Sequence, residues 1–414
     1  MTLIRTGLLN AIAVAIRILT SLALNKILAV KIGANGYAVM GQFQNFVNMV
    51  ITVASGAVNT GVTKYTAENF DNEQRQIEIW RTAGTLALIG SSVAGLVLAV
   101  FHQPLSLLIL HDVQYADVFI WLGAGIVLFA FNALLLSILN GKKEIGRYVM
   151  ANIASSVFGL ILTGGLAYYG GIRGALIALS INQSVVFLVT LALCWRASWF
   201  KLRFMVGKID RDALRGLSKF TLMALTSAIC IPVSQILIRN HIGEQFGMPA
   251  AGHWEALMRI SSLYLMIVTT PLAVYYLPRL SEIRDREELW QEVMQGYRLI
   301  LPVAALGAVS IYFLRDFLIS LLFTAEFAPM RDLFAWQMVG DTVKIGSWLL
   351  GYILIGRAMT TAYIATEIVF SVSWVCLVWI MTNLLGPNGA QLGYFLNYLA
   401  HWLTMIVLVV RYVR

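Results

Sequence analysis

Long apolar stretches separated by short polar ones run through the whole chain and limit the folds open to it. About 20 consecutive apolar residues form a helix that crosses the roughly 30 Å hydrocarbon core of a bilayer. Of the 414 residues, 59% are hydrophobic and only 12% are charged, a charged fraction too small for a water-facing surface. We therefore expect an all-α membrane protein of about twelve transmembrane helices joined by short loops.

The apolar pattern also gives the approximate position of each span. The first stretch, from about Leu8 to Val30, is longer than the apolar core of a cleavable signal peptide, so we expect it to remain as the first span. The sequence predicts spans at about 7–30, 42–63, 82–102, 117–139, 148–169, 173–195, 216–238, 254–277, 295–314, 333–356, 360–383 and 389–410.

Lys and Arg are distributed unevenly between the predicted loops. With the N-terminus placed in the cytoplasm, 21 of them fall on the cytoplasmic side and five on the opposite side. Basic residues are retained on the cytoplasmic side of membrane proteins, so both termini are expected there. The same rule accounts for the net charge of +9 without any nucleic-acid partner.

The chain repeats itself weakly. Similar residues recur at a constant offset of 215, including Gly141 with Gly356, Lys142 with Arg357, and Asn182 with Asn397. We expect two six-helix lobes, residues 1–205 and 206–414, related by a pseudo-two-fold axis along the membrane normal. In transporters built from parallel repeats of this kind, the substrate site lies between the halves.

Polar side chains follow helical spacing in the second predicted span. Polar groups inside a span are costly unless they face protein, a cavity or water. The stripe predicts a helix that lines a polar lumen, and bonds between helices remain the alternative. Its members are Gln44, Asn48, Thr52, Ser55 and Asn59.

Four basic residues fall inside predicted spans: Lys26 lies near the end of its span, and the other three are Arg17, Arg259 and Lys344. In a cavity they would attract diphosphate or carboxylate groups, and Arg binds phosphate oxygens through two parallel hydrogen bonds. Local ion pairs of Arg259 with Glu255 and of Lys344 with Asp341 are the alternative, because both pairs have helical spacing.

Two sets of site residues follow from these patterns. The amide groups are expected to bind sugar hydroxyls and the cations to bind an anion. The predicted substrate-binding residues of the lumen are Arg17, Asn48, Asn59, Asn182, Arg259, Gln337, Lys344 and Asn397. The candidates for proton coupling are Glu255, Asp341, Glu367 and His401.

Motifs that would indicate catalysis or a bound cofactor are absent from the sequence. It contains no G-x-S-x-G, H-E-x-x-H, P-loop or C-x-x-C pattern. Its three cysteines lie in apolar segments and its five histidines lack the spacing of metal ligands. We expect no cofactor, no metal and no enzymatic activity.

Three stretches of the sequence point to a known family: NTGVTKY (59–65), LSKFTLMAL (217–225) and MRDLFAWQMVGDTVKIG (330–346). Through them, and over its whole length, the chain resembles the Wzx family of lipid-linked oligosaccharide flippases, especially those of the enterobacterial common antigen. This family belongs to the multidrug/oligosaccharidyl-lipid/polysaccharide exporter superfamily. The resemblance implies a V-shaped pair of lobes, as in MATE transporters, around a cationic cavity.

The resemblance also implies a function. It predicts alternating-access transfer of an undecaprenyl-diphosphate-linked oligosaccharide, an O-antigen or common-antigen repeat, from the cytoplasmic to the periplasmic leaflet of a bacterial inner membrane. Besides this substrate and membrane lipids, the expected partners are a polysaccharide polymerase and a chain-length regulator of lipopolysaccharide and related surface-polysaccharide synthesis. The alternatives are a cation or drug antiporter of the same superfamily and a membrane polysaccharide polymerase.

Overall fold

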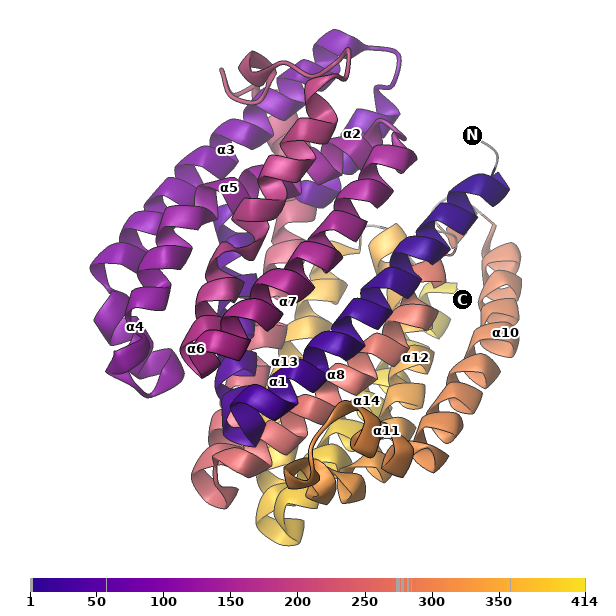
Figure 1. The fold of residues 1–414 in the computed structure, drawn as a ribbon. Coiled ribbons are helices and arrows are strands. Elements are labelled where there is room, and N and C mark those ends of the chain that lie inside the picture. Colours follow the sequence, from indigo (N-terminus) through magenta and orange to yellow (C-terminus); the bar gives the residue numbers. More distant parts are fainter. Residues whose placement is uncertain are drawn as a thin grey trace. The chain divides into compact units, whose positions relative to one another are not determined.

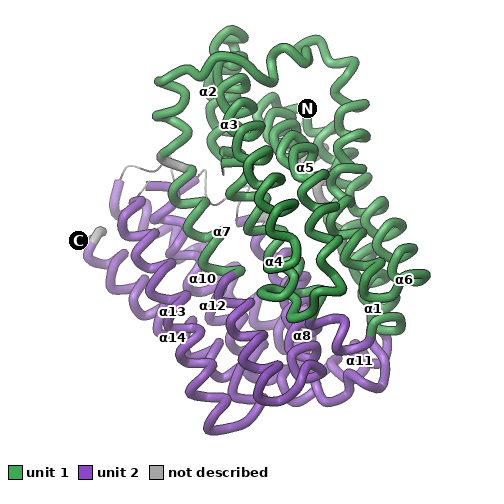
Figure 2. Tube along the Cα trace, turned by 90° about the vertical axis from the view of Figure 1, so that its left-hand side faces the viewer, with its two compact units in different colours: residues 1–32, 39–232 green, residues 33–38, 233–414 purple. Residues whose placement is uncertain are grey.

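The computed structural model describes residues 3–56, 58–272, 276, 279–280, 283, 285–357 and 359–413. All regular secondary structure in these residues is helical, which confirms the all-α prediction (Figure 1). The helices gather into two compact units, coloured separately in Figure 2. Unit 1 consists of residues 1–32 and 39–232, and unit 2 of residues 33–38 and 233–414.

Two helices contribute to both units: α1 (Leu3–Ala54), whose residues 33–38 belong to unit 2, and α7 (Arg211–Phe246). Helix α7 contains Pro232, and the division between the units falls directly after this residue. Proline lacks the N–H that would continue the helical hydrogen bonds, so it weakens the helix at this point. The lobes predicted at 1–205 and 206–414 divide the chain before α7 and stay a prediction.

In unit 1, α5 packs between α3 and α6. The core beside it includes Phe43 and Phe119, whose rings meet edge to face with centroids 5.4 Å apart. The helices of this unit before α7 are α1 (Leu3–Ala54), α2 (Asn59–Glu68), α3 (Glu73–Val100), α4 (His102–Leu110), α5 (Asp117–Gly141) and α6 (Ile145–Trp195), with 3₁₀ turns η1 (Val113–Tyr115) and η2 (Leu202–Phe204).

In unit 2, α12 packs against α10 and α14, and α14 also packs against α13. Buried Val293, Ile345 and Leu349 belong to the core that these helices share. Beyond α7, the helices are α8 (Met248–Pro271), α10 (Arg286–Phe313), α11 (Arg315–Leu322), α12 (Phe334–Gly356), α13 (Thr360–Leu385) and α14 (Gly389–Val413), with 3₁₀ segments η4 (Ala325–Leu333) and η5 (Gly386–Asn388).

Helices α1 and α6 are too long to cross a bilayer once. At ~1.5 Å per residue, the 52 residues of α1 would extend for about 78 Å if straight. Each helix is broken at a glycine with positive φ: Gly33 in α1 (φ 61°, ψ −170°) and Gly171 in α6 (φ 55°, ψ −137°). Each therefore consists of two arms.

The backbone repeats at the predicted offset of 215 where α5 leads into α6 and where α12 leads into α13. The N–H of Lys142 bonds the carbonyl of Ile138 at 2.8 Å, and the N–H of Arg357 bonds that of Ile353 at 2.9 Å. Two further bonds match in the same way. The bond from the Glu144 N–H to the Leu139 carbonyl corresponds to the bond from the Met359 N–H to the Leu354 carbonyl. In the same way, the bond from the Tyr148 N–H to the Glu144 carbonyl corresponds to the bond from the Tyr363 N–H to the Met359 carbonyl.

The turn between the next two helical arms repeats as well. Gly171 corresponds to Gly386, which has φ 70° and ψ −157°. Three residues later, a Cβ on Gly174 would lie 1.9 Å from the Leu166 carbonyl oxygen, and a Cβ on Gly389 would lie 2.1 Å from that of Met381. Only glycine allows so close a return of the chain. The repeat is thus present in the backbone as well as in the residue pattern.

Eight stretches of the described residues are long and apolar enough to cross a membrane. Three of these stretches contain Gly33, Gly171 or Gly386 and so hold more than one helical arm: Ile12–Ala54, Ile145–Trp195 and Thr360–Arg411. The count of twelve spans therefore stays a prediction.

The start of α7 is tied to α3 by a surface ion pair. Asp210 accepts a hydrogen bond from the N–H of Ala213 at 2.8 Å and from Arg75 Nη1 at 2.9 Å. Its carboxylate thereby satisfies an N–H in the first turn of the helix. The Ala213 N–H and the Arg75 guanidinium together lower the pKa of Asp210 below its usual value.

Candidate functional site

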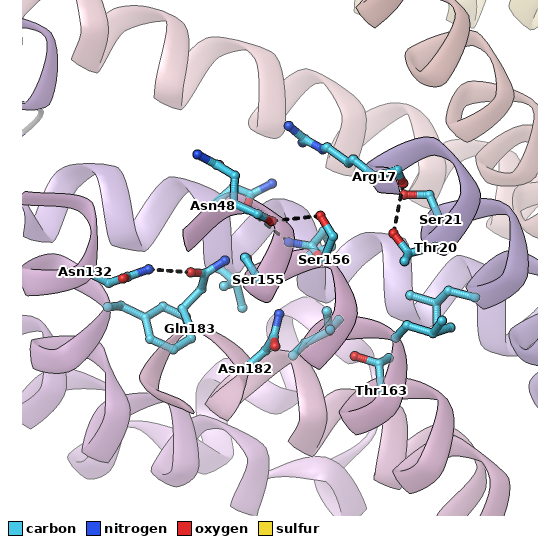
Figure 3. A pocket seen from close by; sticks show the side chains of 18 of the residues that line it. Arg17, Thr20, Ser21, Asn48, Asn132, Ser155, Ser156, Thr163, Asn182 and Gln183 are labelled. Atoms are coloured by element: carbon cyan, nitrogen blue, oxygen red, sulfur yellow. Dashed lines mark hydrogen bonds between the residues drawn. The ribbon is translucent and has the colours of Figure 1, made fainter. Parts of the chain in front are cut away.

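Unit 1 contains a cavity of about 540 Å³ between α1, α5 and α6 (Figure 3). Both arms of α1 and both arms of α6 supply lining residues, because each helix turns back at its glycine break. The volume lies within the roughly 300–1,000 Å³ of sites that bind small molecules.

The walls of this cavity are rich in uncharged hydrogen-bonding groups. Carboxamides and hydroxyls come from all three helices, and apolar side chains such as Phe129 fill the gaps between them. The polar uncharged lining residues are Thr20, Ser21, Gln44, Asn48, Asn132, Asn152, Ser155, Ser156, Thr163, Asn182 and Gln183.

Some of these amides bond each other and leave other atoms free. Asn132 Nδ2 donates to Gln183 Oε1 at 2.8 Å, as Figure 3 shows, and Gln44 Nε2 donates to Asn48 Oδ1 at 3.0 Å. The Oδ1 atoms of Asn132 and Asn182 are buried and accept no hydrogen bond from the described residues. The cavity therefore retains hydrogen-bonding capacity that the protein itself does not use.

Arg17 is the charged residue among those that line the cavity. It lies in the first arm of α1, and its side chain is exposed. No carboxylate appears in the lining, so the cavity carries a net positive charge. An anion that enters it would meet the guanidinium without competition from an acidic neighbour.

Of the three predicted amide residues in unit 1, two line this cavity and one does not. Asn48 and Asn182 are both in its wall. The stripe of the second span does not continue to Asn59, because α1 ends at Ala54 and the chain turns at Gly56 with φ 68°. Asn59 instead begins α2, so the expectation of one continuous stripe was wrong at its last member.

In unit 2, Arg259 is held in an ion pair that includes a buried arginine. Glu255 accepts from Arg259 Nε at 2.9 Å and from Arg239 Nη2 at 2.5 Å. The Arg239 side chain is only 1% exposed and lies against the ring of Trp254. Arg259 lies over the ring of buried Tyr37, 5.1 Å from its centroid.

The predicted seventh span, 216–238, ends one residue before Arg239. Helix α7 continues to Phe246, so Arg239 lies in a helix and not in a loop. With two arginines on one carboxylate, the cluster keeps one net positive charge. Glu255 is already bound on both oxygens, an arrangement that favours a positioning role over proton transfer.

Asp341 and Gln337 form a buried network between α8, α12 and α14. The Asp341 carboxylate accepts from Ser261 Oγ at 2.7 Å, Tyr394 Oη at 2.8 Å and Gln337 Nε2 at 3.1 Å. Asp341 and Gln337 are both fully buried. A carboxylate with three donors is stabilised in the interior without a direct ion pair.

Lys344 lies one turn from Asp341, but its ammonium is surrounded by aromatic rings. Its Nζ is 4.8 Å from the ring centroids of both Trp348 and Tyr398, and 5.4 Å from that of Tyr394. Cation–π attraction is strong where a cation is desolvated. The alternative of a local Asp341–Lys344 ion pair is not what the structure shows, because no salt bridge joins these two residues.

The remaining predicted residues of unit 2 lie on α13 and α14. His401 Nδ1 shares a 2.5 Å hydrogen bond with Ser347 Oγ, and its ring lies against Phe370. Glu367 is half-buried in α13. Asn397 is buried in α14, and its Oδ1 accepts no hydrogen bond from the described residues.

The structure thus places Arg17 in unit 1, and Arg259 and Lys344 in unit 2. A single cationic site formed by all three stays a prediction. Sequence reasoning missed Asn132, Gln183 and Arg239. For Arg239, an acidic residue 16 positions later was the available signal, and for Gln183 it was the neighbouring Asn182, whereas Asn132 stands isolated in an apolar helix and gave none.

Comparisons with known proteins agree on family and fold. The model of a family described as polysaccharide biosynthesis protein matches residues 43–332. The Lipid III flippases of Escherichia coli (strain K12) and Shigella flexneri are each 29% identical to this chain over 408 residues, which cover 97% of this chain and 97% of the relative.

Solved structures of transporters share the fold. An inward-facing multidrug resistance MATE family transporter of the MOP superfamily superposes with a TM-score of 0.80 at 16% identity, covering 96% of this chain and 94% of the transporter. A MOP superfamily transporter from Pyrococcus furiosus gives 0.73 at 13% identity, covering 99% and 95%. Together with the apolar helices, these matches identify a multi-pass membrane protein with the MATE transporter fold. The chain belongs to the polysaccharide biosynthesis protein family.

Proposed function

We propose that this chain is a flippase that moves a lipid-linked oligosaccharide across the membrane by alternating access. The observation that carries the proposal is the cavity of unit 1, which combines many uncharged hydrogen-bonding groups with one cation and no carboxylate. That composition suits a sugar chain joined to an anionic linkage. The similarity to Lipid III flippases over 97% of both chains supports the same function.

The proposed substrate is an oligosaccharide linked to undecaprenyl diphosphate. Its polar head would enter the protein while its prenyl tail stays in the lipid. Moving an unpaired diphosphate through a hydrocarbon core is prohibitive, so the protein has to supply compensating charge. Arg17 does this in unit 1, and Arg259 and Lys344 are the candidates in unit 2.

Arg259 is well suited to this role because of how it is held. Of the guanidinium nitrogens of Arg259, Glu255 accepts a hydrogen bond only from Nε. Among the described residues, the two terminal nitrogens of Arg259 therefore have no protein acceptor. A guanidinium fixed at one edge presents the other edge to an incoming phosphate. Arg239 neutralises the other oxygen of Glu255, so Arg259 retains net charge for the substrate.

The setting of the proposed flippase follows from the charge distribution of the loops. We place the chain in a bacterial inner membrane with both termini in the cytoplasm, so that transfer runs towards the periplasm. A polymerase and a chain-length regulator would use the transferred repeat units and are the proposed protein partners. The repeat itself is an O-antigen or common-antigen unit.

Coupling to protons is a second part of the proposal. Asp341 is the strongest candidate carrier, because it is fully buried and its hydrogen bonds come from three uncharged groups on three helices. His401 and Glu367 are further candidates, whereas Glu255 is fixed between two arginines. A proton gradient should then accelerate transfer in wild-type protein but not in Asp341→Asn.

The test replaces each cation singly and follows the lipid. In cells that depend on this chain for surface polysaccharide, Arg17→Ala should reduce export and leave the undecaprenyl-linked intermediate in the inner leaflet. Arg17→Lys should retain part of the activity, since it keeps the charge but loses the bidentate geometry. Arg259→Ala and Lys344→Ala test the cations of unit 2 in the same way. Normal export in all three Ala variants would refute the cationic mechanism.

The alternative of a cation or drug antiporter makes the opposite demand on the cavity. Such a transporter needs carboxylates or aromatic faces for its cationic substrate. The residues that line the cavity of unit 1 offer a guanidinium and amides instead. Efflux of cationic dyes by the purified chain in vesicles, unaffected by Arg17→Ala, would favour the antiporter.

A further inference from the structure

We infer, building on the proposed flippase function, that the cavity of unit 1 is a subsite for uncharged sugar residues, and that Asn132, Asn182 and Gln183 are the residues that recognise them. Sugars differ from phosphates in presenting many hydroxyls that both donate and accept hydrogen bonds. The lining matches this property, because carboxamides also donate and accept. A phosphate only accepts, so an amide oxygen contributes nothing to its binding.

The bonded pair of Asn132 and Gln183 is the centre of this subsite. It joins α5 to the second arm of α6 by a single 2.8 Å hydrogen bond, from Asn132 Nδ2 to Gln183 Oε1 (Figure 3). That bond leaves an acceptor on Asn132 and a donor on Gln183 without partners among the described residues. An acceptor beside a donor complements two neighbouring hydroxyls of a sugar ring.

Burial makes these free groups significant. Asn132 is only 2% exposed, yet its Oδ1 accepts no hydrogen bond from the part of the chain that is described. Buried polar atoms are nearly always bonded, so an unused one beside a cavity indicates a ligand or an ordered water. Asn182 has the same property at Oδ1 and also lines the cavity.

Gly159 keeps the third amide of the proposed subsite, that of Asn182, accessible. Gly159, on the first arm of α6, lies opposite Asn182, and a Cβ there would be 3.4 Å from Asn182 Nδ2. Any longer side chain would cover this amide. Phe129, a buried core residue, closes the lining on its apolar side.

The position of the charge separates this subsite from an anion site. Arg17 lies on α1, whereas the Asn132–Gln183 pair joins α5 to α6. The cation and this amide pair thus belong to different helices of the lining. We assign the sugars to the Asn132–Gln183 pair and Asn182, and an anionic group, from the diphosphate or from an acidic sugar, to Arg17.

The experiment compares two lipids on the purified full-length chain in nanodiscs. One probe is undecaprenyl diphosphate without sugar, and the other is undecaprenyl diphosphate carrying a neutral trisaccharide. Equilibrium dissociation constants are measured for wild type, Asn132→Leu/Gln183→Met, Asn182→Leu and Arg17→Gln. The control is Gln245→Met/Asn383→Leu, which removes a similar amide–amide bond of 3.0 Å in unit 2.

The amide variants should weaken binding of the glycosylated lipid by about tenfold or more, because several hydrogen bonds are lost. They should leave binding of the sugar-free lipid unchanged. Arg17→Gln should weaken binding of both lipids, and the control should change neither. Preserved thermal unfolding midpoints would show that each variant is folded.

Four outcomes would overturn the inference. If wild type binds the glycosylated lipid and the amide variants bind both probes as wild type does, the subsite fails while the flippase proposal stands. If the amide variants lose both probes equally, or wild type gains nothing from the sugars, the amides do not recognise sugar. If wild type binds neither lipid, the proposed function itself fails.

Discussion

The backbone of unit 1 from α5 to α6 repeats in unit 2 from α12 to α14, but the two units use this shared plan differently. Positions 215 apart have the same turns and hydrogen bonds, whereas the side chains at the cavity have diverged. Small, aliphatic or amide residues of unit 1 correspond to aromatic residues of unit 2: Ala133 to Trp348, Gly159 to Trp374, Leu179 to Tyr394, and Gln183 to Tyr398.

The divergence explains why a polar cavity forms at this place in unit 1. In unit 2, Trp374 and Tyr394 are buried and pack edge to face, with centroids 5.7 Å apart. Tyr394 and Tyr398 also enclose the Lys344 ammonium. One copy of the scaffold thus keeps an open amide-lined space, and the other buries a network of charges and aromatic rings. A duplicated backbone does not require a duplicated site.

The largest expected effect is on the free energy of unfolding, and it tests whether the buried charges of unit 2 stabilise the fold. Arg239→Ala removes one partner of a buried ion pair, which typically costs ~3–5 kcal/mol. Arg17→Ala, at an exposed side chain of unit 1, should cost less than ~0.5 kcal/mol. Denaturant unfolding of both variants in detergent measures the difference. Equal losses would contradict the contrast between the units.

The second prediction converts a residue of unit 1 into its counterpart in unit 2. Gly159→Trp should fill the cavity beside Asn182 and reduce lipid transfer by about tenfold or more, the loss expected for ~1.4 kcal/mol of binding. Gly165→Trp is the matched control on the same arm, because a Cβ there meets nothing within 4 Å. Normal transfer by the Gly159 variant would show that this cavity is not on the substrate path.

A third and smaller effect compares one helix cap in each unit. Asn72 caps α3 in unit 1 by accepting from the Arg75 N–H at 3.0 Å, and Asp285 caps α10 in unit 2 by accepting from the Glu288 N–H at 2.9 Å. Asn72→Ala and Asp285→Ala should each cost ~1 kcal/mol of unfolding free energy. If only one of the two variants is destabilised, the caps are not equivalent in energy.

The smallest effect concerns the carboxylate that begins α7. The pKa of Asp210 is lowered in the folded protein by the Ala213 N–H and Arg75, so the folded state favours the ionised form. The resulting stability is present above the unfolded pKa of ~3.9 and is lost as the pH falls below it. Against wild type, Asp210→Asn should lose less than ~1 kcal/mol near neutral pH.

That difference should shrink towards zero as the unfolding measurements are taken to pH values below the carboxyl range. A difference that persists at low pH would mean that Asp210 acts through packing and not through its charge.

Hydropathy predicted the helical membrane architecture, and residues matching at a constant offset predicted the repeat, because both depend on patterns along the chain. The structure adds that the same offset of 215 relates the glycine turns at Gly171 and Gly386, which the residue pairs had not identified. The number of spans was harder to predict, since helical arms joined at a glycine such as Gly33 form one apolar stretch.

The candidate site was less predictable, because its partners meet across helices. Arg17, Asn48 and Asn182 were identified as polar residues in apolar spans, and all three line the cavity of unit 1. The bond from Asn132 to Gln183 links residues 51 positions apart and leaves no periodic signal. The donors to Asp341 from α8 and α14 are likewise set by packing alone.

The pairing of Arg239 with Glu255 has a consequence for biogenesis. An arginine inserted without its partner is costly, with ~2.5–3.5 kcal/mol as the value at the centre of a span. Arg239 lies seven residues before the end of α7, and its acid follows only 16 residues later on α8. Helix α7 would therefore insert poorly into the membrane on its own. The nascent chain should release α7 and α8 into lipid together, as a hairpin whose two opposite charges have already met.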